Sequence, residues 1–317
     1  MLLPSQVNQP RQLILDCDPG IDDAVALALI LASPEFELLA ITTTTGNVSL
    51  ELTTTNTLKL LKLFEREEIP VAAGVDRPDF VEVLTHYPKI HAADGLGGVV
   101  LPDTSTKRSS MNAMEMMASI LRLAEPRSIT IAVIGPLTNI ALVLDTYPEL
   151  IDRIDELVIM GGTTVKGNIT PVSEFNIWSD PASAAAVLER RDLDILLVGL
   201  DVTRSATLDD DDLQKLSAAS TAGVYISDMI RGYLDHGADG WPMHDALAIA
   251  AMLDDELLGA DPADIRVHVE QSDDYARTFY TFGKAITLRS DCKPSGVRVA
   301  LRVDADRFRE ILFSRLL

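Results

Sequence analysis

Short apolar runs alternate along this chain with longer segments in which leucine and alanine recur at helical spacing. The short runs predict buried strands, and the longer segments predict helices that pack on a sheet. The expected strands are Leu13–Leu15, Leu38–Thr43, Val71–Ala73, Ile129–Ile134, Leu157–Met160 and Ile195–Leu200, and the expected helices are Ala24–Leu31, Leu50–Glu65, Met111–Ala124, Ala222–Leu234, His244–Leu253 and segments that begin near Ile140, Pro181 and Asp209–Asp212. This alternation predicts an α/β fold with an open, mostly parallel, Rossmann-like sheet flanked by helices.

The remaining segments set the limits of the domain. Residues 1–11 have no such pattern and are expected to form a flexible tail, whereas Pro78–Thr106 is rich in Gly and Pro and is expected to be a functional loop. Near the end of the chain, Arg266–Glu270, Arg277–Phe282 and Val297–Arg302 alternate with the period of antiparallel strands. No linker or internal repeat divides the chain, so residues 12–317 are expected to form a single domain.

The charge balance narrows the possible partners. The 317 residues include 27 basic and 48 acidic side chains, which gives a formal net charge of −21. Such a chain would repel nucleic acids and anionic membranes, so we expect a neutral or cationic small substrate, or a metal ion. Its two cysteines form no disulfide framework and no apolar run is long enough to cross a membrane, so a cytoplasmic location is expected.

The densest polar cluster follows the first expected strand. Around the turn formed by Pro19-Gly20 lie the aspartates Asp16, Asp18, Asp22 and Asp23. Like charges so close together repel one another, so they need a cation, hydrogen bonds or raised pKa values. The N-terminus of the helix that follows can stabilise one or two carboxylates, but it cannot easily stabilise all of them.

Several explanations of this cluster are open. A capped, solvated loop would need no ligand. An EF-hand is excluded, because it requires glycine and glutamate where this chain has Ile21 and Leu27. A phosphatase of the haloacid dehalogenase type also begins with an aspartate pair such as Asp16 and Asp18, but it does not need the Gly-x-Asp-Asp that follows here. The remaining explanation is a site for a hard cation with oxygen ligands.

Other polar clusters occupy equivalent places along the chain. In a doubly wound sheet, the segments that follow the strands converge on one crevice. Glu174 and Asn176 flank Phe175, so a strand-like alternation would point both side chains toward that crevice. The clusters expected there are Asp16–Asp23, Thr45–Asn47, Ile134–Asn139, Gly161–Asn176 and, at the start of a helix, His244-Asp245.

Several motifs, taken in chain order, resemble the inosine-uridine-preferring nucleoside hydrolase family: DCDPGIDDA, TTTTGN, DGLGG, GPLTNIA, GGTTVKGNITPVSEFN and HDALA. The similarity runs from Ile14 to about Leu253, and its most specific parts are the first motif and GN-x-x-P-x-x-EFN. The resemblance implies a calcium-dependent, open α/β hydrolase that splits the N-glycosidic bond of purine or pyrimidine ribonucleosides into free base and ribose. It also implies a homodimer or homotetramer.

The same resemblance assigns roles to individual residues. Asp18 corresponds to the catalytic base, which takes a proton from the attacking water, and also to a calcium ligand. Asp23, Asp245 and the backbone carbonyl of Ile134 correspond to the other calcium ligands. The remaining matches are Asp22, Asn47, Met160, Glu174 and Asn176 at ribose-holding positions, His244 as the leaving-group histidine, His91 as a second histidine near the base, and Asp16 as a residue that orients the others.

These roles are chemically coherent. Breaking a ribosyl C–N bond develops positive charge on the sugar ring, which a carboxylate-rich pocket stabilises. Three positions depart from the family pattern and leave their local effects open: Ala92 replaces a common glycine beside His91, Ser173 a common alanine, and Ala246 a common proline.

The sequence leaves the preferred base open, because base contacts come from variable loops such as Leu234–Met243. There, Tyr233 and Trp241 would either stack on a base or pack the loop. Two other functional classes also stay open at this point. One is a non-catalytic homologue that binds ribonucleosides or calcium, and the other is a metal-dependent phosphatase, for which Lys107 and Lys166 are the basic candidates near these motifs.

Overall fold

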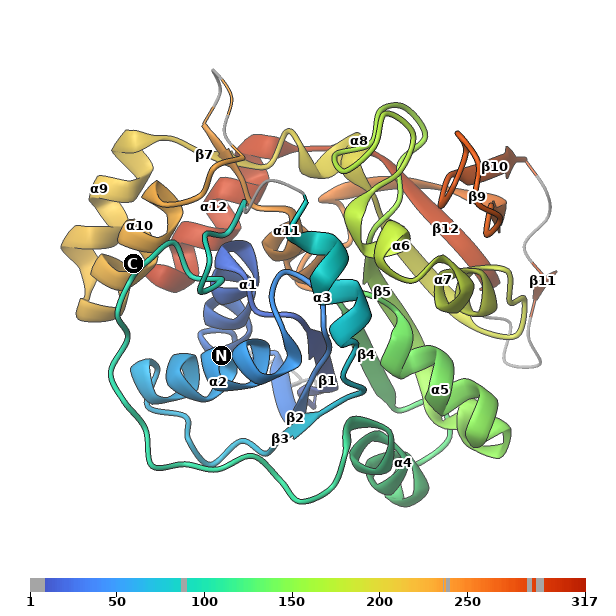
Figure 1. Cartoon of the computed structure of the whole chain (residues 1–317), viewed down its shortest axis with the longest axis horizontal. Coiled ribbons are helices and arrows are strands. Elements are labelled where there is room, and N and C mark those ends of the chain that lie inside the picture. Colours follow the sequence, from blue (N-terminus) through green and yellow to red (C-terminus); the bar gives the residue numbers. More distant parts are fainter. Residues whose placement is uncertain (1–8, 87–89, 236, 238–239, 284–286, 289–293) are drawn as a thin grey trace, which may run out of the picture.

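One large, mostly parallel sheet runs through the molecule, with helices on both of its faces (Figure 1). The structure is a computed structural model that describes residues 9–86, 90–235, 237, 240–283, 287–288 and 294–317. Most of the expected flexible tail, residues 1–8, lies outside the described residues, and the first strand already begins at Arg11.

The strands fall into one large and one small sheet. The large sheet has the order β10-β9-β12-β6-β5-β4-β1-β2-β3, with β11 paired to β12, and the small sheet pairs β7 with β8. The strand bounds are β1 Arg11–Cys17, β2 Phe36–Thr43, β3 Val71–Ala73, β4 Ile129–Val133, β5 Ile154–Met160, β6 Asp194–Val198, β7 Thr207–Leu208, β8 Trp241–Pro242, β9 Leu258–Val267, β10 Thr278–Phe282, β11 Thr287–Leu288 and β12 Pro294–Val303. From β3 to β12 neighbouring strands are parallel, whereas β9 and β10 continue the sheet antiparallel.

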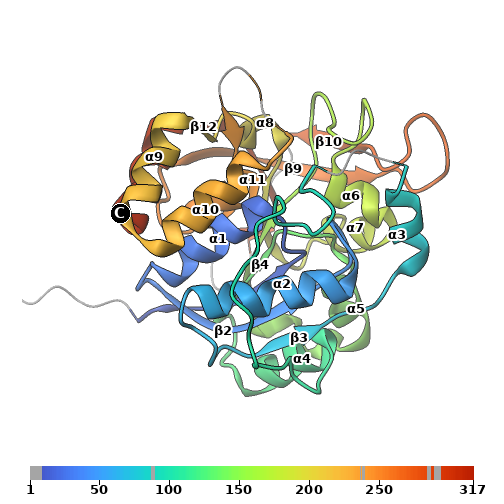
Figure 2. The same cartoon turned by 60° about the vertical axis from the view of Figure 1, so that its left-hand side comes forward.

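The helices connect these strands and cover the sheet. Their bounds are α1 Ile21–Leu31, α2 Leu50–Leu63, α3 Pro78–Leu84, α4 Ala113–Leu123, α5 Thr138–Thr146, a 3₁₀ helix η1 Pro148–Arg153, α6 Phe175–Ser179, α7 Pro181–Leu188, α8 Leu200–Thr203, α9 Asp210–Ala219, α10 Thr221–Arg231, α11 His244–Ala250 and α12 Ala305–Leu316. Figures 1 and 2 show α9, α10 and α12 gathered on one side of the molecule, away from α4 and α5.

The alternation of side chains along β1 explains why a hydrophobic core lies on each face of the sheet. Leu13 and Leu15 pack with α1, α10 and α11 on one face of the sheet, and Ile14 between them packs with α4 and α5 on the other. Because successive residues of a strand point to opposite faces, a strand covered on both faces must be apolar throughout. This is why the central strands appear in the sequence as continuous apolar runs.

The structure confirms the expected α/β alternation and the antiparallel strands near the C-terminus. It corrects several boundaries: α1 begins at Ile21 rather than Ala24, β9 covers Leu258–Val267 rather than Arg266–Glu270, and Leu200 opens α8 instead of ending a strand. The segment Pro78–Thr106 was expected to be loop throughout, but Pro78 at the first position of a helix starts α3. The short β7–β8 pair had no recognisable pattern in the sequence.

The parallel arrangement places several strand ends at one edge of the sheet. Asp18 follows β1, Thr44 follows β2, Ile134 follows β4 and Gly161 follows β5. In open α/β sheets this carboxyl edge is where ligands bind. Within the described part of the chain, none of the helices has the length and apolar character that a membrane crossing requires.

Candidate active site

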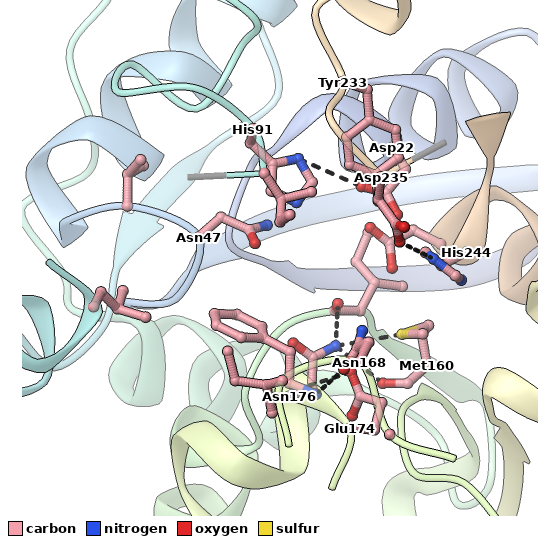
Figure 3. A pocket seen from close by; sticks show the side chains of 18 of the residues that line it. Asp22, Asn47, His91, Met160, Asn168, Glu174, Asn176, Tyr233, Asp235 and His244 are labelled. Atoms are coloured by element: carbon pink, nitrogen blue, oxygen red, sulfur yellow. Dashed lines mark hydrogen bonds and ion pairs between the residues drawn. The ribbon is translucent and has the colours of Figure 1, made fainter. Parts of the chain in front are cut away.

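A cavity of about 920 Å³ opens at the carboxyl edge of the sheet. Its volume lies in the range of small-molecule pockets. Figure 3 shows side chains from separate segments pointing into it. The predicted residues that line the cavity are Asp22, Asn47, His91, Ile134, Met160, Glu174, Asn176, His244 and Asp245, and further lining residues include Asn168, Arg204, Tyr233 and Asp235. The expected convergence of the polar clusters is therefore confirmed.

The turn before α1 is held by its own carboxylates. Asp23 Oδ2 accepts a hydrogen bond from Gly20 N at 2.8 Å, and its Oδ1 accepts one from Asp18 N at 3.2 Å. Asp23 thus satisfies two backbone donors at the start of the helix, as an acidic residue in a first turn commonly does. Asp22 in α1 and Asp245 in α11 also lie in first helical turns, where the helix dipole favours a negative charge, so Asp18 is the carboxylate without such an explanation.

Asp18 is fixed on one side only. Its Oδ2 accepts a hydrogen bond from Asn47 N at 2.7 Å, whereas its buried Oδ1 has no hydrogen-bond partner among the described residues. A Cβ on Gly46 would lie 2.0 Å from Oδ2, and a Cβ on Gly135 would lie 2.6 Å from Oδ1. The two glycines therefore leave the room that the Asp18 carboxylate occupies.

Three buried carboxylates meet beside Asp18. Oxygen atoms of Asp22, Asp23 and Asp245 all lie within 4.8 Å of one another. Burial, followed by the neighbouring Asp22, raises the pKa of Asp23 to about 7. Burial raises the pKa of Asp18 and of Asp245 well above the usual range, with further contributions from neighbouring carboxylates. Ionised together, these groups repel one another, so a cation would stabilise them.

This donor set fits a hard cation. It offers the carboxylate oxygens of Asp22, Asp23 and Asp245, and the cavity beside them is lined by Ile134, whose carbonyl is a further candidate ligand. Asp18 lies outside this group of three and does not line the cavity, although its buried Oδ1 has no hydrogen-bond partner in the described structure. Calcium prefers oxygen ligands of these kinds, whereas zinc prefers nitrogen and sulfur. The three carboxylates that lie within 4.8 Å of one another include Asp22, which the family resemblance assigns to ribose. The other two, Asp23 and Asp245, are assigned to calcium.

Asp16 lies behind this group, away from the cavity. Its Oδ1 accepts hydrogen bonds from Thr42 Oγ1 at 2.6 Å and from Asn139 Nδ2 at 2.8 Å. Burial raises the pKa of Asp16 to about 7, although these two hydrogen bonds act to lower it. Through Thr42 and Asn139, Asp16 links the ends of β1 and β2 to the start of α5.

Glu174 and Asn176 form the opposite wall of the cavity. Glu174 caps α6, and its Oε2 accepts hydrogen bonds from Gly162 N at 3.0 Å and Ile177 N at 3.2 Å. Asn176 Nδ2 donates to the carbonyl oxygens of Ile134 at 2.8 Å and Met160 at 3.2 Å. The expected strand-like alternation across Phe175 is wrong, because this segment is the first turn of a helix, yet both side chains line the cavity.

The structure shows the local setting of the three departures from the family pattern. Ala92 has a φ of 65°, so the loop beside His91 adopts the left-handed conformation that glycine favours, at a cost of roughly 1–2 kcal/mol. The Ser173 hydroxyl donates to the carbonyl of Tyr275 at 2.5 Å and thereby ties the Glu174 segment to the β9–β10 connection. Ala246 is buried in the first turn of α11, which still begins at His244.

His91 closes one side of the cavity. Its Nδ1 accepts a hydrogen bond from Ile21 N at 3.1 Å, and its ring stacks on Tyr233 with 4.9 Å between the centroids. A ring nitrogen that accepts cannot carry a proton, and burial also lowers the pKa of His91. His91 is therefore a neutral ring, and its 3.9 Å approach to Asp22 is not an ion pair.

The ring of His244 lies between Thr203 and Asp235. Its Nδ1 lies 2.7 Å from Thr203 Oγ1 in α8, and its Nε2 lies 3.5 Å from the carboxylate of Asp235 (Figure 3). The ring faces the cavity and makes no hydrogen bond through Nε2 within the described structure. Nε2, although buried, is thus the ring nitrogen with unused hydrogen-bonding capacity.

Several lining residues were not singled out from the sequence. Asn168 belongs to the GN-x-x-P-x-x-EFN motif, and this signal alone could have identified it, whereas Asp235 has no motif around it. Of the two aromatic candidates, Tyr233 lines the cavity, and Trp241 belongs to β8 and packs against the core.

Comparison with known proteins decides the class of this site. The family described as inosine-uridine preferring nucleoside hydrolase matches residues 13–310. The chain belongs to this family. Hydrolysis of the N-glycosidic bond of ribonucleosides, the reaction of the family, therefore applies to this nucleoside hydrolase, and a phosphatase or a member of another hydrolase class is not supported.

Individual relatives agree over almost the whole chain. The pyrimidine-specific ribonucleoside hydrolase RihA of Photobacterium profundum is 36% identical over 96% of this chain and 98% of its own length. Among solved structures, the plant nucleoside hydrolase PpNRh1 has a TM-score of 0.84 and 31% identity, covering 97% of this chain and 99% of its own. A purine-preferring ribonucleoside hydrolase from Gardnerella vaginalis has a TM-score of 0.83 and 30% identity, and the match covers 96% of this chain and 98% of that protein.

Proposed function

We propose that this nucleoside hydrolase uses a calcium ion and the carboxylate of Asp18 to hydrolyse ribonucleosides into free base and ribose. The observation that carries this proposal is the half-satisfied carboxylate of Asp18. One oxygen is held by Asn47 N, and the other is buried beside the carboxylates of Asp22, Asp23 and Asp245 without a hydrogen bond in the described structure.

The reaction requires a base and an electrostatic partner for the sugar. The oxygen of a water molecule attacks C1′ of the ribose, its proton passes to Asp18, and the C1′–N bond breaks with its electron pair on the nucleobase. Burial, followed by the neighbouring Asp23, raises the pKa of Asp18 and so favours its protonated form. A cation that offsets this effect would keep the carboxylate ionised and able to accept the proton. The surrounding carboxylates stabilise the positive charge that develops on the ribose.

We assign Asp18, Asp23, Asp245 and the carbonyl of Ile134 to the calcium ion, and the carboxylate of Asp22 lies within 4.8 Å of those of Asp23 and Asp245. When bound, calcium would offset the repulsion among the carboxylates, favour the ionised form of Asp18 and polarise ligands with oxygen atoms. Asp22, Asn47, Met160, Glu174 and Asn176 would hold the ribose. His91 would lie beside the base, and His244 would donate a proton to the departing base through Nε2.

A panel of ribonucleosides and matched 2′-deoxyribonucleosides, scored for released sugar, tests this proposal. We expect ribose release from ribonucleosides and much lower kcat/KM on the deoxy compounds, because a missing hydroxyl removes hydrogen bonds to the ribose-holding side chains. Equal rates on both series would overturn the ribose assignment. Calcium-dependent binding without any release would instead indicate a non-catalytic homologue.

The relatives of this chain differ in the nucleobase that they prefer. The relatives named above include a pyrimidine-specific and a purine-preferring enzyme, and both are similar to this chain over nearly its full length. We therefore include both base classes in the panel. A homodimer or homotetramer remains our expectation from the family. The net charge and the cysteine content remain our reasons to expect a small-molecule substrate, no nucleic-acid partner and a cytoplasmic location.

A further inference from the structure

The carboxylate of Asp235 faces the cavity from the side opposite the ribose wall. Asp235 follows α10, and next to it Leu234 N donates a hydrogen bond to the carbonyl of Ile90 at 3.0 Å, which fixes the main chain there. Its side chain is 46% exposed, and Oδ2 lies 3.5 Å from Nε2 of the buried His244 (Figure 3). Asp235 is thus placed beside the histidine assigned to the leaving group rather than beside the ribose-holding residues.

Asp235 is ionised and retains free acceptor capacity. The proximity of His244 holds the pKa of Asp235 below its usual range. Arg204, a cationic side chain on the cavity wall, donates through its two terminal nitrogens to the carbonyls of Lys166 at 2.7 Å and Gly167 at 2.9 Å. Among the described residues the Asp235 carboxylate contacts His244, and Asp235 lines the cavity, so its other lone pairs are open to a hydrogen-bond donor there.

We propose that Asp235 selects the nucleobase by accepting a hydrogen bond from a ring or exocyclic N–H of the base. This inference rests on the proposed function and specifies the substrate class. A carboxylate can only accept hydrogen bonds, so it recognises a donor edge and opposes an edge made of acceptors. Bases with a free N–H, such as uracil at N3 or hypoxanthine at N1, fit this position, whereas bases alkylated at that nitrogen do not.

The negative charge of Asp235 has a second effect on the leaving group. A base that departs as an anion is repelled by a nearby carboxylate, whereas a base that receives a proton is not. Asp235 therefore disfavours leaving groups that depart as anions and carry no N–H. The nitrophenolate of a p-nitrophenyl riboside has both properties, which makes it the opposite of a natural base at this position.

Matched methylated substrates test the hydrogen bond. In the unaltered protein, kcat/KM should be about 10- to 100-fold higher for uridine than for 3-methyluridine, or for inosine than for 1-methylinosine, as expected for one charge-assisted hydrogen bond. In Asp235→Ala this ratio should fall close to one, and in Asp235→Asn, which keeps one acceptor oxygen, it should be intermediate. An unchanged ratio in Asp235→Ala would overturn the proposal.

The kcat/KM for the p-nitrophenyl riboside should change in the opposite direction from that for the natural substrates. Asp235→Ala and Asp235→Asn should lose kcat/KM on uridine or inosine but gain it, about two- to tenfold, on the p-nitrophenyl riboside. A role limited to folding would lower both activities, and a role limited to holding His244 would lower turnover of uridine or inosine and leave the p-nitrophenyl riboside unchanged. Either result would also overturn the proposal. Asp211→Asn, an exposed change in α9 that alters the net charge equally, should leave both substrates unaffected.

Failure of the proposed function is recognisable separately. If the unaltered protein releases no ribose from any natural ribonucleoside, the proposed function itself fails before the variants are compared. If it releases ribose and the Asp235 variants change all substrates in parallel, only the assignment of Asp235 fails.

Discussion

Asn47 N holds one oxygen of the Asp18 carboxylate at 2.7 Å and leaves the other, equally buried, without a hydrogen bond in the described structure. A carboxylate fixed in this way has one orientation and one open acceptor. The geometry suits a group that must both face a cation and receive a proton. It also makes the role of Asp18 testable by a change that keeps its shape.

Asp18→Asn should lower kcat by about 10²–10⁴-fold, because asparagine preserves the shape and one oxygen but cannot accept the proton of the attacking water. Thermal unfolding should show that the variant remains folded. Asp16→Asn, which alters a residue behind the cavity, should have a milder effect on kcat. A loss smaller than about tenfold in Asp18→Asn would place the base elsewhere.

Calcium should stabilise the folded protein. Because the acidic group exists only in the folded state, a ligand present at a hundred times its Kd adds about 2.7 kcal/mol to the free energy of unfolding. Thermal unfolding with calcium and after chelation measures this effect, and Asp245→Asn should reduce it. Asp255→Asn, at an exposed position after α11, serves as the control. Full activity in a sample verified as metal-free would contradict the calcium assignment.

His244→Ala should separate natural substrates from an activated one. Natural bases need a proton to leave, so their turnover should fall by about 10²–10⁴-fold, whereas a p-nitrophenyl riboside should be hardly affected. Thr203→Val removes the Nδ1 contact of His244 and should show the same selectivity with a smaller loss. An equal loss on both substrates would assign His244 to positioning or folding.

A surface carboxylate should give the protein a defined acid sensitivity. Glu67 accepts hydrogen bonds from Lys62 at 2.8 Å, Thr104 at 2.6 Å and Thr106 at 2.8 Å, and these hold the pKa of Glu67 at about 2. Since the folded state favours the ionised form, the resulting stability is fully present above about pH 5 and disappears as the pH falls toward 2.

Glu67→Gln should therefore lower the unfolding midpoint in urea near neutral pH, and the difference from the unaltered protein should shrink progressively as the solution is acidified below about pH 5. Glu125→Gln, at an exposed position after α4, should show no such trend. A difference that stays constant with pH would mean that packing of the Thr104–Thr106 segment, rather than the charge of Glu67, determines the effect.

The sequence predicted those features that repeat along the chain. Apolar runs identified the central strands, and the rule that parallel strand ends share one edge correctly placed Asn47 and Ile134 at one cavity with Asp22. Asp245, which opens a helix instead, was also expected there, and it meets Asp23 although 222 residues separate them (245 − 23). Asp180 and Asp209 were correctly expected to start helices, because aspartate accepts backbone hydrogen bonds there.

Features that depend on a single contact could not be predicted. The hydrogen bond between His244 and Thr203 joins segments 41 residues apart and leaves no periodic signal. Glu174 and Asn176 were placed correctly at the cavity but in the wrong local structure, because two polar residues around an aromatic one fit a strand as well as a first helical turn. The loop beside His91 keeps a glycine-like conformation despite Ala92, which composition alone cannot show.

The contacts of Glu174 and Asn176 have a consequence for how a sugar would be received. Both oxygens of Glu174 accept backbone N–H groups, and the amide nitrogen of Asn176 donates to carbonyls at the ends of β4 and β5. The main chain therefore orients these side chains before any ligand arrives, and their conformational entropy is lost during folding rather than during binding. This wall of the cavity should behave as a rigid template, with the same rotamers in the free and the occupied protein, so adaptation to different nucleosides would be left to the loops on the opposite side.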